Sequence, residues 1–129
     1  MPRHISFIFP GQGSQHLGML DENLKNLLHS QIGEINDSLE FNLIDIIDNG
    51  PIEDLNRTSI TQPAILLTSY LYFKNICDEL DIIPNIVCGH SLGEYSALVA
   101  ADCISLKDGL SLVNKRGILM EKCKAGSMY

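Results

Sequence analysis

Residues 86–100 have the sequence IVCGHSLGEYSALVA, in which an apolar run, a glycine-flanked turn and a small-residue segment follow one another directly. The run 86–88 predicts a short buried strand, and residues 94–100 predict a helix. Between them, residues 89–93 satisfy the pattern G-x-S-x-G, which is diagnostic when a strand precedes it and a helix follows it. The sequence therefore predicts a sharp turn that presents Ser91 as a nucleophile.

The glycines of this turn, Gly89 and Gly93, permit a tight backbone in which Ser91 is strained and its hydroxyl projects from the end of the strand. The first N–H groups of the following helix have no partner within the helix and point to the same place. They can meet negative charge that grows on an attacked carbonyl oxygen, and we expect the Leu92 N–H to do so. In the alternative interpretation, the Ser91 side chain only caps the helix.

Two residues beside Ser91 carry ionisable side chains. We expect a structural role for His90, because successive side chains at a sharp turn point in different directions. Glu94 lies in the first helical turn, where a carboxylate is favoured by the positive end of the helix, so we expect a structural role there too.

A second apolar run, residues 5–9, ends at a proline and two glycines, which predicts a buried strand followed by the loop 10–15. Ligands of parallel sheets bind beyond the carboxyl ends of the strands, so we expect this loop and the turn at Ser91 to share one rim. Its glycines let the backbone of Gln12 approach a ligand, and we expect the Gln12 N–H to be a second oxyanion donor. A phosphate-binding loop or a plain turn remains the alternative, although the Lys-Ser/Thr ending and third glycine of nucleotide loops are missing.

The rest of the chain is predicted to be mainly helical. Residues 21–47 show a helical pattern with polar breaks, closed by Asn49-Gly50-Pro51. A long apolar helix is expected over residues 61–80, with Pro63 in its first turn, where the missing N–H costs little. A final helix is expected over residues 106–124. Strands that alternate with helices predict the α/β class, with a short parallel sheet and flanking helices.

Arg116 occupies an unusual position in the last predicted helix. On a wheel of about 100° per residue it lies at the centre of an apolar arc, so we expect its guanidinium to be buried. A buried guanidinium needs an anionic partner, and its fork of donors suits a carboxylate. That carboxylate could belong to a structural Asp or Glu or to a ligand. The apolar arc consists of Leu112, Val113, Leu119, Met120 and Cys123, and the polar side of Ser111, Asn114, Lys115, Glu121 and Lys122.

Composition limits the function further. The 129 residues, with 45% hydrophobic and 19% charged residues, suit a single globular core. We expect a cytoplasmic protein, because no segment resembles a membrane span or a signal peptide. The net charge of −7 argues against nucleic acid or an anionic membrane as a partner. The four cysteines lack ligand spacing, so we expect reduced, mostly buried thiols and no metal site.

Four motifs in a fixed order resemble the acyltransferase family of fatty-acid and polyketide synthesis, in particular its malonyl-CoA:acyl carrier protein transacylases. The resemblance covers essentially the whole chain and implies that residues 1–129 are the N-terminal part of a catalytic domain with an α/β-hydrolase-like core. The motifs are Phe-Pro-Gly-Gln-Gly-Ser-Gln (9–15), Thr-Gln-Pro-Ala (61–64), Gly-His-Ser-Leu-Gly-Glu (89–94) and Lys-Arg-Gly-x-x-Met (115–120).

The resemblance also implies roles for individual residues. Ser91 matches the acylated serine, Gln12 and Leu92 match the oxyanion-hole positions, and Arg116 matches the arginine that holds the malonyl carboxylate. The implied reaction transfers malonyl from coenzyme A to Ser91 and then to the phosphopantetheine thiol of acyl carrier protein. No permanently bound cofactor is implied.

The chain departs from this family in length. Members of the family are longer and insert a ferredoxin-like subdomain before they return to the core with the catalytic histidine. None of His4, His16, His29 and His90 matches that histidine, so we expect a truncated chain that is inactive alone. A patatin-like or α/β-hydrolase enzyme and an inactive remnant are the alternatives. The first-strand loop and Arg116 both argue against a hydrolase.

Overall fold

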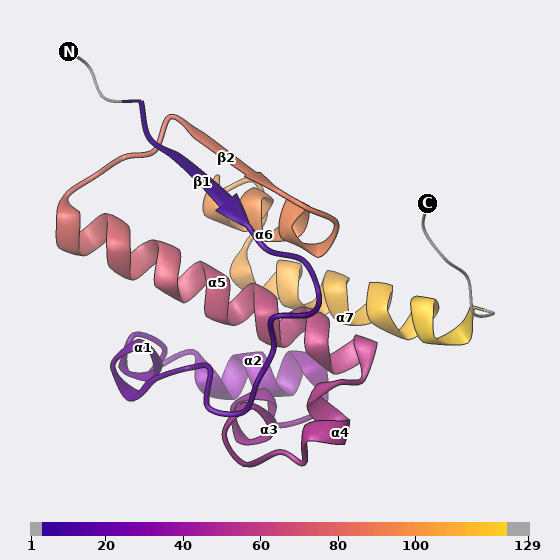
Figure 1. Cartoon of the computed structure of the whole chain (residues 1–129). Coiled ribbons are helices and arrows are strands. Elements are labelled where there is room, and N and C mark those ends of the chain that lie inside the picture. The colour runs from indigo at the N-terminus through magenta and orange to yellow at the C-terminus, as the bar shows by residue number, and fades with distance from the viewer. Residues whose placement is uncertain (1–3, 124–129) are drawn as a thin grey trace.

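A computed structural model describes residues 4–123 of the chain, and Figure 1 shows how they are arranged. Two short strands lie against a layer of helices of which α5 is the longest, and α7 crosses α5 on the way to the C-terminus. None of the helices within this range is long and apolar enough to cross a membrane. The elements are β1 (Ser6–Phe9), α1 (Glu22–Asn26), α2 (Ile32–Leu39), α3 (Leu43–Asn49), α4 (Ile52–Leu55), α5 (Thr58–Leu80), β2 (Ile86–Gly89), α6 (Leu92–Ala100) and α7 (Leu106–Lys122).

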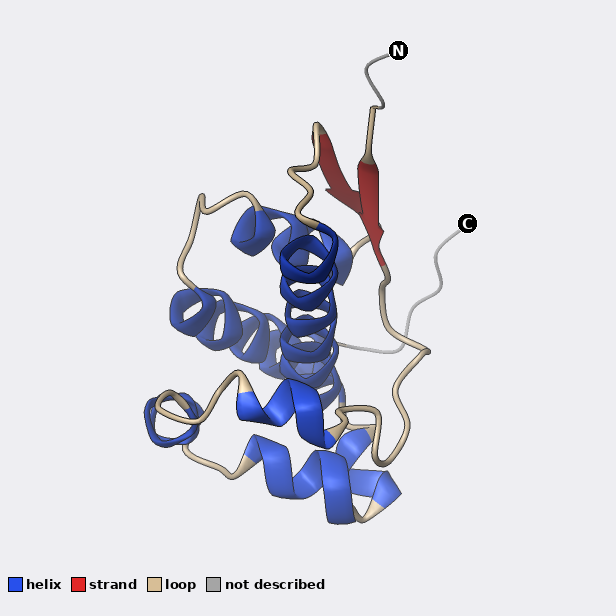
Figure 2. Ribbon diagram, turned by 90° about the vertical axis from the view of Figure 1, so that its left-hand side faces the viewer, coloured by secondary structure: helices blue, strands red, loops and turns tan. Residues whose placement is uncertain are grey.

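The two strands form a parallel pair, in agreement with the predicted α/β class, and Phe9 lies opposite Gly89. Figure 2 shows them on one side of the helices. Phe7 and Phe9 pack edge-on against Phe73 of α5, with ring centroids 4.9 and 5.6 Å apart. The prediction that the strands are buried is wrong for alternate residues, because helices cover only one face of the sheet in the described residues. The exposed residues are Ser6, Ile8, Ile86 and Cys88. The expectation that the cysteines are mostly buried is wrong as well, because Cys88, Cys103 and Cys123 are exposed.

Helix α5 begins earlier than predicted. It starts at Thr58 rather than at residue 61, so Pro63 lies inside the helix and not in its first turn. A proline there has no N–H to donate to the carbonyl four residues earlier, which is that of Ser59. The Asn114 side chain of α7 donates to this Ser59 carbonyl instead, at 2.8 Å. A contact from another helix therefore allows α5 to continue through the proline.

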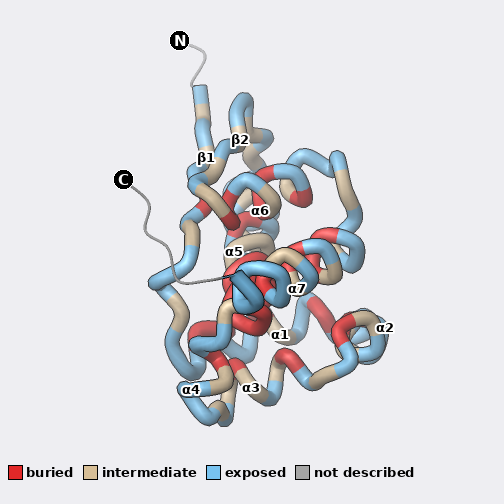
Figure 3. Tube along the Cα trace, turned by 90° about the vertical axis from the view of Figure 1, so that its right-hand side faces the viewer, coloured by how far each residue is buried: buried red, intermediate tan, exposed pale blue. Residues whose placement is uncertain are grey.

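Helix α7 packs closely on the first turn of α5. A Cβ at Gly117 would lie 2.5 Å from Ser59 Cα and 2.6 Å from the Thr58 oxygen, so glycine is required at this crossing. Glu121 accepts hydrogen bonds from the Ser59 N–H and hydroxyl, each at 2.8 Å. Figure 3 shows how the buried residues gather where α5 meets its neighbours. The crossing fixes the position of α7, and with it that of Arg116.

The prediction that the apolar arc around Arg116 on α7 is buried is wrong. Among its five members only Val113 is buried, while Leu119 is 64% exposed and Met120 45% exposed. The face that packs inward instead contains Gly109, Leu110, Val113 and Gly117. Glycine has no side chain and so gives no signal on a hydrophobic wheel, yet it permits the closest approach between helices.

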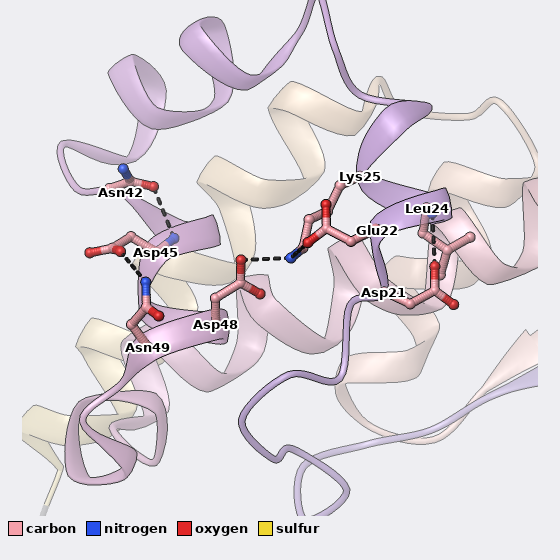
Figure 4. A network of polar contacts seen from close by, with 8 residues as sticks. All are labelled: Asp21, Glu22, Leu24, Lys25, Asn42, Asp45, Asp48 and Asn49. Carbon is pink, nitrogen blue, oxygen red and sulfur yellow. Dashed lines mark hydrogen bonds and ion pairs between the residues drawn. The ribbon is translucent and has the colours of Figure 1, made fainter.

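The segment predicted as helical with polar breaks contains three short helices, α1 to α3. Asp21 caps α1 and Asn42 caps α3, each accepting from a backbone N–H three residues later. Figure 4 shows Lys25 between Glu22 and Asp48, with both ion-pair distances at 2.7 Å. Hydrogen bonds to Asp48 and Glu22 raise the pKa of Lys25. The short helix α4 follows and was not predicted.

Gly93, in the first turn of α6, lies against the backbone at the end of β1. A Cβ at Gly93 would overlap the Phe9 carbonyl oxygen and lie 3.0 Å from the Pro10 oxygen. Both neighbours are backbone atoms, which cannot rotate away as a flexible side chain can. The absence of a side chain at Gly93 therefore allows the start of α6 to lie directly against the end of β1.

We expect Gly93→Ala to lower the free energy of unfolding by about 3 kcal/mol or more, because backbone must move to relieve this overlap. Gly33→Ala is the matched control. Gly33 lies in α2 with open space around it, and there alanine should raise stability by about 0.5 to 1 kcal/mol. Urea denaturation followed by circular dichroism measures both variants, and equal stability of Gly93→Ala and wild type would contradict the close approach.

Candidate active site

Ser91 has the strained backbone that the turn predicts. Its φ is +52° and its ψ is −111°, a combination that a residue other than glycine rarely adopts. Ser91 occupies the N-cap position of α6, but its side chain makes no capping hydrogen bond. The alternative that Ser91 only caps the helix is therefore wrong for this structure. Its hydroxyl is free to take another role.

The loop after β1 and the turn at Ser91 share one rim, as predicted. The His90 N–H donates to the Phe9 carbonyl at 3.2 Å, which ties the turn to the end of β1. A Cβ at Gly11 would lie 3.1 Å from the His90 carbonyl oxygen and 3.9 Å from Ser91 Cβ. The parallel pairing of the strands brings these two segments together, although about 80 residues separate them in the chain.

The two predicted oxyanion donors have no competing acceptor. Within residues 4–123, neither the Gln12 N–H nor the Leu92 N–H donates to another protein group. The Gln12 side chain donates to Thr58 Oγ1 at 3.4 Å. Gln15 holds the same loop more firmly, because it accepts from the Gly13 N–H at 2.9 Å and donates to Asn56 at 3.0 Å. The roles of Gln12 and Leu92 stay predictions.

Arg116 reaches the nucleophile. Its Nη2 donates to Ser91 Oγ at 3.1 Å, and its Nη1 donates to Gln62 Oε1 at 2.8 Å. The guanidinium is half-buried and lies 5.4 Å from the ring centroid of Tyr95 on α6. Among the described residues it forms no ion pair with a carboxylate. No Asp or Glu among residues 4–123 is therefore its structural partner, and within these residues the positive charge faces the serine without a counter-ion.

Two residues that surround this arginine, Gln62 and Tyr95, could not be assigned to the site from the sequence. Gln62 belongs to the Thr-Gln-Pro-Ala motif, which is noted only as part of a resemblance, and its complete burial could have been suspected from the apolar residues that follow it. Tyr95 lies one residue after the Gly-His-Ser-Leu-Gly-Glu motif and gave no distinct signal. Both contacts join segments that are far apart in the chain.

The other ionisable groups near the site do not contact the nucleophile. His90 and Glu94 are exposed, and no histidine in the described residues forms a hydrogen bond with Ser91 Oγ.

Glu121 lies farther away, where α7 crosses α5. Its pKa is lowered by the hydrogen bond from the Ser59 backbone N–H, and also by the Ser59 hydroxyl and Arg57, although partial burial opposes this. No group of three or more His, Cys, Asp and Glu side chains between residues 4 and 123 could hold a metal ion.

The sequence model of one family, described as "Acyl transferase domain", matches residues 6–128. Malonyl CoA-acyl carrier protein transacylase of Salmonella typhimurium is 40% identical to the chain over 120 residues, which are 92% of this chain and 39% of the relative. The chain thus spans about two fifths of the length of the curated relatives it matches.

Solved structures show the same likeness. The malonyl CoA-acyl carrier protein transacylase of Coxiella burnetii superposes with a TM-score of 0.83 at 40% identity, over 95% of this chain and 39% of its own. A malonyl-transacylase solved in complex with a type II PKS acyl-carrier protein superposes with a TM-score of 0.81 at 39% identity, over 93% and 40%. At such identities, these matches extend beyond a general likeness of fold.

Proposed function

Because this chain belongs to the acyl transferase domain family, we propose that it forms the nucleophile side of a malonyl-CoA:acyl carrier protein transacylase. Ser91 takes up the malonyl group from coenzyme A as an ester and passes it to the phosphopantetheine thiol of acyl carrier protein. The names of the relatives support both the acyl group and the carrier. By the resemblance of its motifs, we place this transfer in fatty-acid or polyketide synthesis.

One observation carries the proposal: a strained serine shares its site with an arginine that has no counter-ion within residues 4–123. The Ser91 hydroxyl and the Arg116 Nη2 lie 3.1 Å apart. A malonyl group on Ser91 carries its carboxylate one methylene beyond the ester carbonyl, which is within reach of a guanidinium so close to the nucleophile. An unpaired cation at this distance selects an acyl group that ends in a carboxylate.

The reaction consists of two matched steps. The Ser91 hydroxyl attacks the thioester carbonyl carbon, so a C–O bond forms, the C–S bond breaks, and the hydroxyl proton passes through a general base to the coenzyme A thiolate. The carrier thiol then attacks the ester carbonyl carbon, so a new C–S bond forms, the C–O bond to Ser91 breaks, and the thiol proton passes through the general base to the Ser91 oxygen. In both steps the Gln12 and Leu92 N–H groups stabilise the charge on the carbonyl oxygen.

We assign the general base to polypeptide beyond the described residues. Arg116 is the one side chain among residues 4–123 that forms a hydrogen bond with Ser91 Oγ, and a guanidinium cannot accept a proton. In this proposal residues 1–129 correspond to the N-terminal part of an α/β-hydrolase-like catalytic domain, and a histidine from the remaining part completes the site. The isolated 129-residue chain then acylates slowly and does not turn over repeatedly.

Incubation of the chain with malonyl-CoA, followed by intact-mass analysis, tests the proposal. We expect a malonyl adduct that peptide mapping places on Ser91, and loss of that adduct when holo acyl carrier protein is added, with malonyl-carrier as the product. Release of free malonate without a carrier would instead indicate hydrolysis. If no adduct forms after prolonged incubation, the proposed acylation of Ser91 in this chain is wrong.

A further inference from the structure

Gln62 is the buried end of the contact that holds Arg116. Its side chain is completely buried in α5, and its Oε1 accepts from the Arg116 Nη1 at 2.8 Å. This glutamine belongs to the Thr-Gln-Pro-Ala motif, for which the reaction above uses no residue. A fully buried amide keeps its place only when its polar atoms have partners, so its orientation is strongly determined.

The second end of the amide fixes which way it points. Gln62 Nε2 donates to the Met120 sulfur at 3.2 Å, and Met120 lies one helical turn beyond Arg116 on α7. A flipped amide would place its own N–H group against the Arg116 Nη1, with donor facing donor. The sulfur is a weak acceptor, but it leaves the amide oxygen as the group that faces the guanidinium.

The contact between α5 and α7 keeps this pair in register. Asn114 and Glu121 bind the first turn of α5 through Ser59, and Gly117 permits the close approach of the two backbones. Gln62 lies one turn beyond Ser59, while Arg116 lies directly before Gly117. The two side chains are therefore brought together by the close crossing of α5 and α7.

Gln62 is also uncharged, which matters for the charge of its partner. A carboxylate at this position would hold the arginine equally well, but it would neutralise the positive charge. An amide holds the guanidinium by one amino group and leaves its charge available. Among the described residues, the other contacts of Arg116 are the Ser91 hydroxyl and the Tyr95 ring, neither of which carries a negative charge.

We propose that Gln62 is a positioning residue that determines the preference for an acidic acyl group. It holds Arg116 by Nη1 as an unpaired cation and leaves Nη2, which contacts Ser91, to receive the carboxylate of the acyl group. The inference rests on the proposed function, because it names the part of that site which sets its selectivity. Gln62 itself contacts neither the nucleophile nor the acyl group.

Two substitutions separate the charge of this residue from its hydrogen bond. Gln62→Glu keeps the shape and the acceptor but pairs the arginine with a carboxylate. Gln62→Met keeps the length and removes both. Gln31→Glu is the charge control, because Gln31 is exposed at the start of α2 and its side chain makes no capping bond. Thermal melting of each variant reports whether it is folded.

The first readout is a titration with sodium malonate, in which the side-chain NMR resonances of Arg116 report binding. We expect wild type and Gln31→Glu to bind malonate alike, and Gln62→Glu to bind it about tenfold more weakly or worse. Gln62→Met should bind with an intermediate affinity, because the cation is present but no longer held. Equal affinity of Gln62→Glu and wild type, or no binding by wild type, would overturn the inference.

The second readout is the initial rate of Ser91 acylation by malonyl-CoA and by acetyl-CoA. Gln62→Glu should slow the malonyl reaction about tenfold more than the acetyl reaction. A purely structural role would slow both reactions equally, and that result would overturn the inference. If wild type forms no adduct with either thioester, the proposed function is wrong, whereas the malonate titration still decides the role of Gln62.

Discussion

Ser91→Ala is expected to abolish the covalent malonyl adduct, with no residual mass shift after incubation with malonyl-CoA. The reason is chemical, because alanine has no oxygen that can form the ester. The expected loss is complete, whereas removal of an oxyanion donor would leave a reduced rate. Intact-mass analysis at matched incubation times measures the adduct, and thermal melting verifies that the variant is folded.

His90→Ala is the matched control for this experiment. His90 lies next to the nucleophile, but its side chain is exposed and makes no hydrogen bond with Ser91 in the described residues. We expect this variant to retain the adduct. Peptide mapping that places the malonyl group on Ser14, Ser96 or a cysteine would contradict the assignment of Ser91, and so would an adduct that persists in Ser91→Ala.

The nucleophile turn could be predicted from the sequence because its determinants are local. A β-branched run, two glycines two residues either side of Ser91 and a small-residue segment lie within fifteen consecutive residues. Each requirement has a physical cause: the backbone at Ser91 is strained, and Gly89 and Gly93 avoid overlap with neighbouring backbone. The sequence also predicted that the loop after β1 and the turn at Ser91 share one rim, because parallel pairing places the ends of both strands together.

The surroundings of Arg116 could not be predicted in the same way. A helical wheel weighs apolar side chains, and it therefore placed Arg116 on a buried face that is mostly exposed. The actual packing depends on Gly117, which contributes no side chain, and on Asn114 and Glu121, which were assigned to a polar outer side. Their partner is Ser59, more than fifty residues away in the sequence.

The prediction that α5 begins at residue 61 was wrong for a related reason. Proline is common at the first position of a helix, which favoured a start close to Pro63. The actual helix begins at Thr58 and continues through the proline because Asn114 satisfies the Ser59 carbonyl that the proline leaves free. Local propensity gives the usual position of a proline, whereas a long-range hydrogen bond allows the exception. The same shift brings Gln62 into the interior of the helix, where it meets Arg116.

Arg116→Ala is expected to slow acylation of Ser91 by malonyl-CoA about 10- to 100-fold, because a hydrogen bond to a charged group contributes roughly 1.5 to 3 kcal/mol. Arg116 is half-buried, so a larger loss typical of fully buried ion pairs is not expected. Acylation by acetyl-CoA should be unchanged or faster, since the acetyl group has no carboxylate to bind and the substitution widens the site. Parallel initial rates with the two thioesters measure this difference.

Lys115→Ala distinguishes a specific contact from general attraction between charges. Lys115 precedes Arg116 in the chain, carries the same charge and is exposed. If the arginine acts only by raising the local positive potential, both substitutions should slow the malonyl reaction to a similar extent, and added salt should reduce the effect of each. If Arg116 binds the carboxylate directly, Lys115→Ala should change the rate less than about twofold, because exposed charges contribute little. Equal losses for malonyl and acetyl groups in Arg116→Ala would show that the arginine is structural.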